Sequence, residues 1–287
     1  MAQEHERGAR AYLIVSLHLT FWMMKVFLSI LLLAAMGLAQ TDSAPPSQSI
    51  PVDQENAQKA RAVLQRAIQA LGGSAYLNIQ DITQEGRTYT FYHGRPSSLG
   101  ILFWRFYKFP DKDRIELTKQ RDVIYVYQGD TGTEITYKGP HPEDPKDLTE
   151  YLRRRHFSLD WVLRKWLSEP GIALFYEGQT VAEEKPVEQV TVMNAHNEGV
   201  TLYLNTDDHL PVKKTYSWRD TTDKQRNIED EVYDNYREVQ GVMTPFTITR
   251  LYNGDMSGQR FLTAVSYNQG ISDSRFEATA PSGPKKP

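Results

Sequence analysis

An amphipathic helix near the start of the chain, followed by a long series of short strands, constrains the fold of this sequence most strongly. Residues 53–73 place apolar side chains three and four positions apart, so that they form one stripe on a helix. Asp53 is predicted to cap the first turn, and Gly72 with Gly73 to end the helix. A helix of this kind needs a sheet against which to bury its stripe. The stripe consists of Ala57, Ala60, Leu64, Ala67, Ile68 and Leu71.

Most of the remaining chain predicts strands that are separated by short turns. Strands joined by such tight turns must pair in the antiparallel direction, because parallel pairing needs long crossovers. Gly86 is predicted to form a β-bulge in the first strand. The predicted strands cover residues 79–92, 99–109, 114–119, 123–128, 133–138, 172–177, 188–193, 200–205, 212–218, 229–237, 244–252 and 260–267.

A second helical region is predicted over residues 147–168. Asp147 and Glu150 approximate a capping box at its start, and Ser158 is predicted to begin a new helix after a break. Pro170 and Gly171 end the region. Two helical regions among many antiparallel strands indicate an α+β fold that is mainly antiparallel β.

The segment 99–109 is apolar on both faces of the predicted strand. A strand with this pattern is expected to be covered on both sides over part of its length. Its aromatic residues, with others downstream, are candidates for the lining of a cavity, and simple core packing is the alternative. These candidates are Phe103, Trp104, Phe106, Tyr125, Tyr127, Trp161 and Trp166.

The amino-terminal segment 11–39 is strongly apolar, and only His18 and Lys25 interrupt it. One interpretation is a membrane anchor, since the segment is long enough to span a bilayer. The interpretation that we favour is a signal peptide within residues 1–39, preceded by an upstream extension and cleaved after Ala39. It predicts a periplasmic protein, and the anchor interpretation predicts attachment to the inner membrane. We further expect a flexible linker at 40–52, a single domain at 53–280 and a disordered tail at 281–287.

No motif in the sequence indicates catalysis. The chain has no cysteine, its histidines lack metal-ligand spacing, and neither a G-x-S-x-G elbow nor a phosphate-binding loop is present. We therefore expect no enzyme activity, no metal and no cofactor, and the net charge of −3 argues against a nucleic-acid partner. A weaker alternative is a hydrolase whose carboxylate pair comes from Glu183, Glu184, Glu229, Asp230 and Glu231.

One compact basic run occupies residues 153–156. It is interpreted either as a solvated helix face or as a surface that contacts anionic head groups of a membrane.

Three stretches together resemble a known family. They are ALGG at 70–73 with the strand that follows, LYLNTDDHLPVKKTYS at 202–217, and VYDNYREVQGVMTPFTITRLYNG at 232–254. Over roughly residues 54–278 the chain resembles the LolA/LolB-like superfamily of periplasmic lipoprotein carriers. The resemblance implies a strongly curved, half-open antiparallel β-barrel with the two helical regions on its concave side.

The resemblance also implies a function. Acyl chains of lipids, or of a lipidated protein, would occupy a cavity between the sheet and the helices, with Leu64 and Ile68 added to the candidate lining. Carriers of this family hold the lid with a buried arginine on an early strand, and both Arg87 and Arg105 are candidates for that role. The function implied is carriage without catalysis. The alternative is a regulatory or protein-interaction module of the cell envelope on the same fold.

Overall fold

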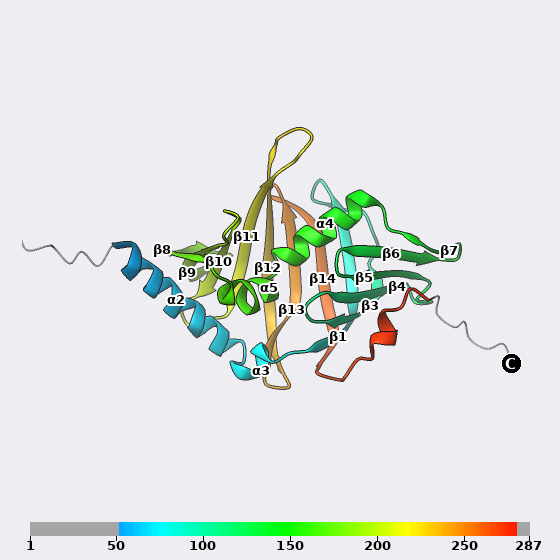
Figure 1. The fold of residues 1–287 in the computed structure, drawn as a ribbon, viewed down its shortest axis with the longest axis horizontal. Coiled ribbons are helices and arrows are strands. Elements are labelled where there is room, and N and C mark those ends of the chain that lie inside the picture. Colours follow the sequence, from blue (N-terminus) through cyan, green and yellow to red (C-terminus); the bar gives the residue numbers. More distant parts are fainter. Residues whose placement is uncertain (1–51, 280–287) are drawn as a thin grey trace, which may run out of the picture. The chain divides into compact units, whose positions relative to one another are not determined.

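The computed structural model describes residues 52–279, which form one curved, open antiparallel sheet covered on its concave face by helices (Figure 1). The strand order is β7-β6-β5-β4-β3-β1-β14-β13-β12-β11-β10-β9-β8, and β2 pairs with β1 outside this path. The sheet does not close into a barrel. The fold class predicted from the sequence is thus confirmed.

The helices and strands have the following bounds. The helices are α2 (Val52–Ala70), α3 (Ser74–Leu77), α4 (Pro145–His156) and α5 (Leu159–Arg164), with 3-10 turns η1 (Trp166–Ser168) and η2 (Asp273–Phe276). The first strands are β1 (Asp81–Tyr92), β2 (Arg95–Pro96), β3 (Ile101–Lys108), β4 (Lys112–Leu117), β5 (Val123–Gln128), β6 (Thr131–Thr136) and β7 (Gly139–Pro142). The others are β8 (Ala173–Ala182), β9 (Lys185–Met193), β10 (Gly199–Asn205), β11 (Pro211–Arg219), β12 (Arg226–Val239), β13 (Val242–Tyr252) and β14 (Asp255–Tyr267).

Every predicted strand overlaps an observed one, and only the short β2 and β7 were not predicted. The predicted bulge is confirmed, since the register between β1 and β14 shifts between Glu85 and Gly86. A Cβ atom at Gly86 would lie 2.1 Å from the carbonyl oxygen of Phe261. Only glycine therefore permits this close approach of the two strands.

Helix α2 packs against β8 and β9 at one end of the sheet. Its stripe is buried as predicted, with Ala60, Leu64 and Ala67 almost fully covered in the main core. The predicted cap at Asp53 is wrong, because the helix already begins at Val52 and Asp53 lies inside the first turn. There its carboxylate still lies near the positive end of the helix dipole.

The second helical region is divided at Phe157. Its predicted capping box is wrong: the cap is Asp144, whose side chain accepts a hydrogen bond from the backbone N–H of Lys146 at 2.8 Å. Pro145 fits the first turn because it has no N–H to satisfy there. The new helix predicted at Ser158 is confirmed, since Ser158 caps α5.

Strand β3 is covered on both faces over part of its length, as its sequence predicts. Phe103 and Tyr107 are buried on the concave face. On the opposite face Phe106 packs against a small core that includes Ile124 and Phe276, the latter from η2 near the end of the described chain. This C-terminal turn thus covers part of the convex face.

The predictions for residues 1–51 and 280–287, namely the signal peptide, most of the linker and the tail, lie outside the described residues. None of the helices within residues 52–279 is both long enough and apolar enough to cross a bilayer.

Candidate functional site

Helix α4 covers the middle of the concave face, and a partly open cavity lies beneath it. None of its residues is fully buried, although it lies across the sheet. The cavity has a volume of about 660 Å³, which is within the usual range for small-molecule sites. It extends from the end of α2 and from α3, past α4, to strands β12–β14.

The lining of the cavity is mixed in polarity. Its apolar part includes Leu71, Ile79, Ile82, Phe103, Ile115, Leu117, Val242 and Ile248. Its tyrosines are Tyr76, Tyr107, Tyr125, Tyr127, Tyr151, Tyr233 and Tyr267, and its charged residues include Arg105, Asp113, Glu143, Glu231, Arg250 and Arg260. Such a lining suits a ligand that has both apolar and polar parts.

One polar chain of contacts joins α4 to strands β3 and β4. Arg105 donates from Nε and Nη2 to the carboxylate of Asp113, with an Nη2–Oδ2 distance of 2.8 Å. The hydroxyl of Tyr151 on α4 donates to the same carboxylate oxygen at 3.0 Å. Burial opposes the charge of Arg105, but Asp113 outweighs it and raises the pKa of Arg105 above its ordinary value. The arginine therefore stays charged and fixes the acceptor for Tyr151.

Other polar contacts hold the second half of α4. Arg154 donates from Nε to Glu229 on β12 at 3.1 Å, and Arg155 donates to the carbonyl oxygen of Gly129 at 2.6 Å. At the end of the helix, buried Lys214 on β11 donates to the carbonyl oxygen of Phe157 at 2.7 Å. Helix α4 is thus attached to the sheet mainly through charged and hydroxyl groups.

Two stacked tyrosines close the cavity near β5. The rings of Tyr127 and Tyr151 lie 3.4 Å apart and nearly parallel. The hydroxyl of Tyr127 donates to Oε1 of Glu143 at 2.7 Å. Burial raises the pKa of Glu143, and the hydrogen bond from Tyr127 opposes this shift.

The structure brings four of the residues predicted for the site to this cavity. Phe103, Tyr125, Tyr127 and Arg105 line it. Arg105 contacts α4 indirectly, since Asp113 accepts hydrogen bonds from both its guanidinium and the hydroxyl of Tyr151, and its role in holding a lid stays a prediction.

Arg87 is exposed, and its Nη1 donates to the carbonyl oxygen of Gly100 at 3.3 Å on the opposite face of β1. Its side chain points away from the cavity because neighbours on a strand alternate between faces.

The other predicted residues lie elsewhere. Trp104 and Phe106 point to the convex face for the same reason of alternation, and there Arg121 and Arg275 lie over their rings at 4.0 and 3.9 Å. Leu64, Ile68, Trp161 and Trp166 pack in or against the main core instead of lining the cavity. These residues therefore pack against other parts of the protein, which is the alternative to cavity lining that the sequence left open.

Several lining residues were not predicted from the sequence. Asp113 was assigned to a turn but lies in β4, and Tyr151 was assigned to no role. Arg250 and Arg260 lie on β13 and β14, where the alternation around Ile248 marks the concave face. That alternation is the one signal that could have identified them.

The basic run 153–156 is engaged within the protein, so the interpretation as a solvated helix face is wrong. Arg153 stacks over Trp218 with its guanidinium carbon 3.8 Å from the ring centroid. Nε2 of His156 lies 2.8 Å from Oε2 of Glu198. Arg154 and Arg155 bind Glu229 and the carbonyl oxygen of Gly129, as described above. The four side chains thus secure α4.

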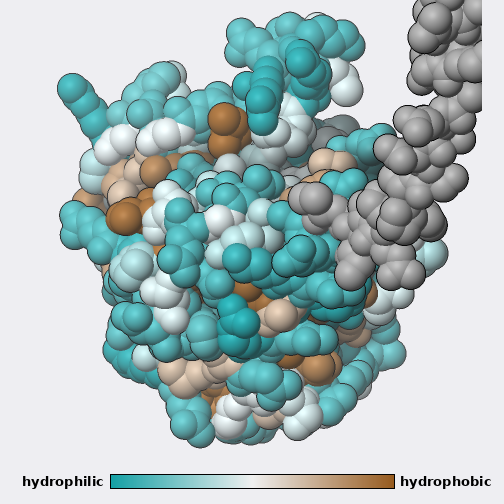
Figure 2. Space-filling model, turned by 90° about the vertical axis from the view of Figure 1, so that its left-hand side faces the viewer, coloured by the Kyte–Doolittle hydropathy of each residue, from teal (hydrophilic) through white to brown (hydrophobic). Residues whose placement is uncertain are grey.

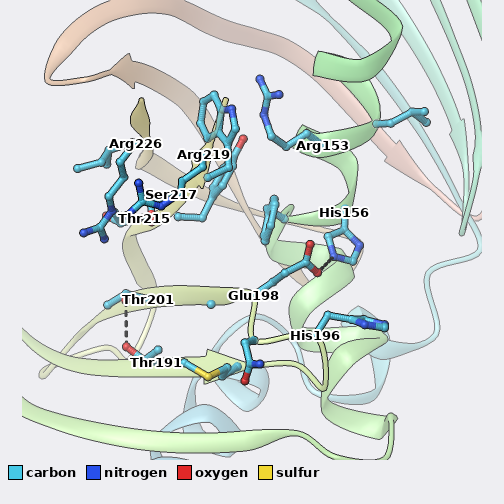
Figure 3. Close-up of a pocket in the computed structure, with 18 residues that line it drawn as sticks. Arg153, His156, Thr191, His196, Glu198, Thr201, Thr215, Ser217, Arg219 and Arg226 are labelled. Atoms are coloured by element: carbon cyan, nitrogen blue, oxygen red, sulfur yellow. Dashed lines mark hydrogen bonds and ion pairs between the residues drawn. The ribbon is translucent and has the colours of Figure 1, made fainter. Parts of the chain in front are cut away.

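A second, more open pocket of about 870 Å³ lies where the end of α4 meets strands β9–β12 (Figure 3). Hydroxyl groups of Thr191, Thr201, Thr215 and Ser217 line one part of it, and Arg153, His156 and Glu198 the other. The hydroxyl oxygens of Thr191 and Thr201 lie 2.9 Å apart. The polar groups of this pocket thus bind largely to one another.

The carboxylates considered for a hydrolase do not lie together as one group of unpaired acids. Glu229 accepts from Tyr216 and Arg154, and Glu231 pairs with Lys214 at 3.1 Å. Asp230 points to the other face of β12, where Lys213 lies 3.3 Å away. Glu183 and Glu184 lie in the exposed turn between β8 and β9.

No protein-family model and no curated protein matches this chain. Among solved structures it is similar to a DUF1329 family protein from Desulfovibrio piger, with a TM-score of 0.55 and 12% identity over 76% of this chain and 97% of that one. It is also similar to a domain from Vibrio parahaemolyticus proposed to be an outer membrane lipoprotein-sorting protein, with a TM-score of 0.51 and 10% identity over 76% and 97% of the two chains. At these identities the likeness concerns the fold, and the LolA-like fold expected from the sequence is confirmed.

Proposed function

We propose that this protein is an exported, carrier-like binding protein that holds the acyl chain of a lipid or of a lipidated protein in the cavity beneath α4, without catalysis. The observation that carries the proposal is the partly open cavity of about 660 Å³ between the sheet and helix α4, which polar contacts hold in place. The similar domain from Vibrio parahaemolyticus is named for lipoprotein sorting, which supports a lipidated protein or a lipid as the ligand. We propose a periplasmic location after cleavage near Ala39, with an inner-membrane anchor as the alternative.

The apolar part of the lining supports binding of a hydrocarbon chain. Ile79, Ile82 and Val242 present aliphatic surface to the cavity. Each methylene that is buried there contributes about 0.8 kcal/mol, so a chain of moderate length offsets the cost of ordering it.

The attachment of α4 supports entry of such a ligand. Many of its contacts are hydrogen bonds and ion pairs, which water can replace when the helix moves away. Helix α4 itself has no fully buried residue, unlike α2, so its movement returns less of its own apolar surface to water. Helix α4 can therefore act as a lid.

The test uses native mass spectrometry of the purified protein for bound lipid, together with titration by the neutral apolar probe N-phenylnaphthylamine. We expect saturable binding that Ile248→Trp reduces by filling the cavity, while Val181→Trp on the exposed end of β8 leaves it unchanged. Absence of lipid together with absence of saturable binding by folded protein would refute the proposal.

A protein-interaction module remains the second candidate, and one observation favours it. Among the strands of residues 52–279, β8 is the last of the open sheet and pairs with β9 alone, so its outer edge could accept a further strand. Phe175 and Val181 on it are exposed. Figure 2 views this side and shows hydrophobic residues in small separate groups within a mainly hydrophilic surface. The coloured residues of this view form no broad apolar patch, and we therefore favour the carrier over the interaction module.

A further inference from the structure

Arg260 lines the cavity and has no hydrogen-bond or ion-pair partner among the described residues. Its side chain lies on the concave face of β14, between Thr88 of β1 and Ile248 of β13, both of which also line the cavity. Within residues 52–279 its guanidinium forms no hydrogen bond or ion pair, and its central carbon lies 5.2 Å from the centroid of the Phe103 ring. A part-buried arginine is normally paired, so its isolation needs an explanation.

The neighbouring arginines each have a carboxylate partner of the kind that Arg260 lacks among the described residues. Arg105 is paired with Asp113, and Arg250 donates from Nε to Glu231 at 3.1 Å. Both carboxylates are thus already engaged by other cations. The protein supplies acceptors for two of the three arginines in this part of the cavity and leaves the third open to the cavity.

Electrostatics disfavour the cation where it lies. Burial, with the nearby charges of Arg250 and Arg105, lowers the pKa of Arg260 to about 9. A negative group that entered the cavity would offset both effects through charge-assisted hydrogen bonds to the guanidinium.

One apolar end of the cavity lies at a distance from this cation along β1. Thr88, which pairs with Arg260, is six residues along β1 from Ile82, which corresponds to about 20 Å of strand. Ile79, Ile82 and Val242 line the cavity at that far end. The arrangement fits a ligand with one charged end and an apolar chain.

We propose that the cavity selects an amphiphile with an anionic head group, carboxylate or phosphate, and that Arg260 binds this group while the chain lies toward Ile82. The inference rests on the proposed carrier function and specifies its ligand class. A free inorganic anion lacks the chain and would use only the Arg260 end of the cavity.

The experiment measures displacement of N-phenylnaphthylamine from the full chain by dodecanoate, by dodecanol and by inorganic phosphate at a pH where the acid is ionised. Dodecanoate should compete about tenfold better than dodecanol, and phosphate should compete poorly. Arg260→Met should remove the preference for the acid without weakening dodecanol binding, and Arg260→Lys should retain part of it. Arg87→Met, one strand away on the opposite face, is the matched control and should change nothing.

Any other result of the displacement experiment contradicts either the role of Arg260, the amphiphilic ligand or the carrier function. Equal binding of acid and alcohol, or a preference that survives Arg260→Met, refutes the role of Arg260 and leaves the carrier intact. If phosphate competes as strongly as dodecanoate, the ligand of Arg260 is a free anion and not an amphiphile. If N-phenylnaphthylamine itself does not bind, and no compound can therefore displace it, the carrier function is refuted.

Discussion

Helices α2 and α4 lie over the same face of the sheet but are attached to it by different chemistry (Figure 1). Helix α2 buries an apolar stripe in the main core, in which Leu64 is 1% exposed. Helix α4 has no fully buried residue and is held through Tyr151, Arg154 and Arg155. The same sheet therefore carries one helix that is part of its core and one that is fastened over a cavity.

The difference teaches which part of the fold is expected to move. Separating α2 from β8 and β9 would return apolar surface to water, at a cost that grows with area. Separating α4 exchanges protein hydrogen bonds for bonds to water, which costs about 1 kcal/mol for each. We therefore expect α4 to open locally at a lower free energy than α2.

The largest effect is expected at Leu64. Leu64→Ala leaves a cavity under α2 and should lower the free energy of unfolding by about 2–5 kcal/mol. Gln65→Ala, the next residue on the exposed side of the same helix, should change it by less than about 0.5 kcal/mol. Urea denaturation of both variants measures the difference, and equal small effects would show that α2 is not held by its stripe.

An intermediate effect is expected at Glu231, which secures the end of α4 indirectly. Its Oε2 lies 3.1 Å from Nζ of Lys214, the residue that also binds the carbonyl of Phe157. Burial raises the pKa of Glu231, but Lys214, Arg250 and the hydroxyl of Tyr233 outweigh it and hold the pKa well below its ordinary value. A depressed pKa contributes stability above the pKa of the unfolded chain, about 4.3, and loses it as the pH falls below that value.

Glu231→Gln should therefore lower the free energy of unfolding by about 1–3 kcal/mol near neutral pH. The gap between the variant and the unsubstituted protein should narrow at about pH 3, because the unfolded chain binds a proton at Glu231 there while the folded protein keeps the charge. Urea denaturation at both pH values measures this. A gap that stays constant across the range would contradict the ionic role of Glu231.

The smallest effect on stability is expected at Tyr151, where the readout is local. Tyr151→Phe removes the hydrogen bond to Asp113 and should cost about 0.5–1.5 kcal/mol, since Arg105 still satisfies the carboxylate. Hydrogen exchange should quicken in the amides of α4 and stay unchanged in α2. Tyr137→Phe, at an exposed turn, is the control. Faster exchange in both helices would mean that they open together.

Local patterns in the sequence were sufficient for much of the fold. The spacing of Ala60, Leu64 and Ala67 predicted the face that α2 buries, and Gly86 predicted the bulge in β1. Ser158 predicted the start of α5. In each case the decisive interactions lie within a few residues of the chain, or depend on a periodicity that the sequence displays directly.

The sequence could not decide which of two neighbouring aromatic residues faces the cavity. Phe103 and Trp104 looked equivalent, but the strand directs Phe103 to the concave face and Trp104 to the convex face. Both faces of β3 are apolar, so the pattern alone does not distinguish them. The register with β1 and β4 fixes the orientation.

The sequence by itself determined the helix α2, the antiparallel sheet and the class of fold, whereas tertiary structure alone decided the charges of the cavity. Asp113, Tyr151 and Arg105 meet through contacts between two strands and a helix. Within the described part of the chain Arg260 has no partner, because the nearby carboxylates bind other cations. An ion pair depends on distances between side chains far apart in the chain, and no local pattern encodes those distances. Burial then fixes the energetic weight of each pair, since a charge removed from water must find its partner nearby.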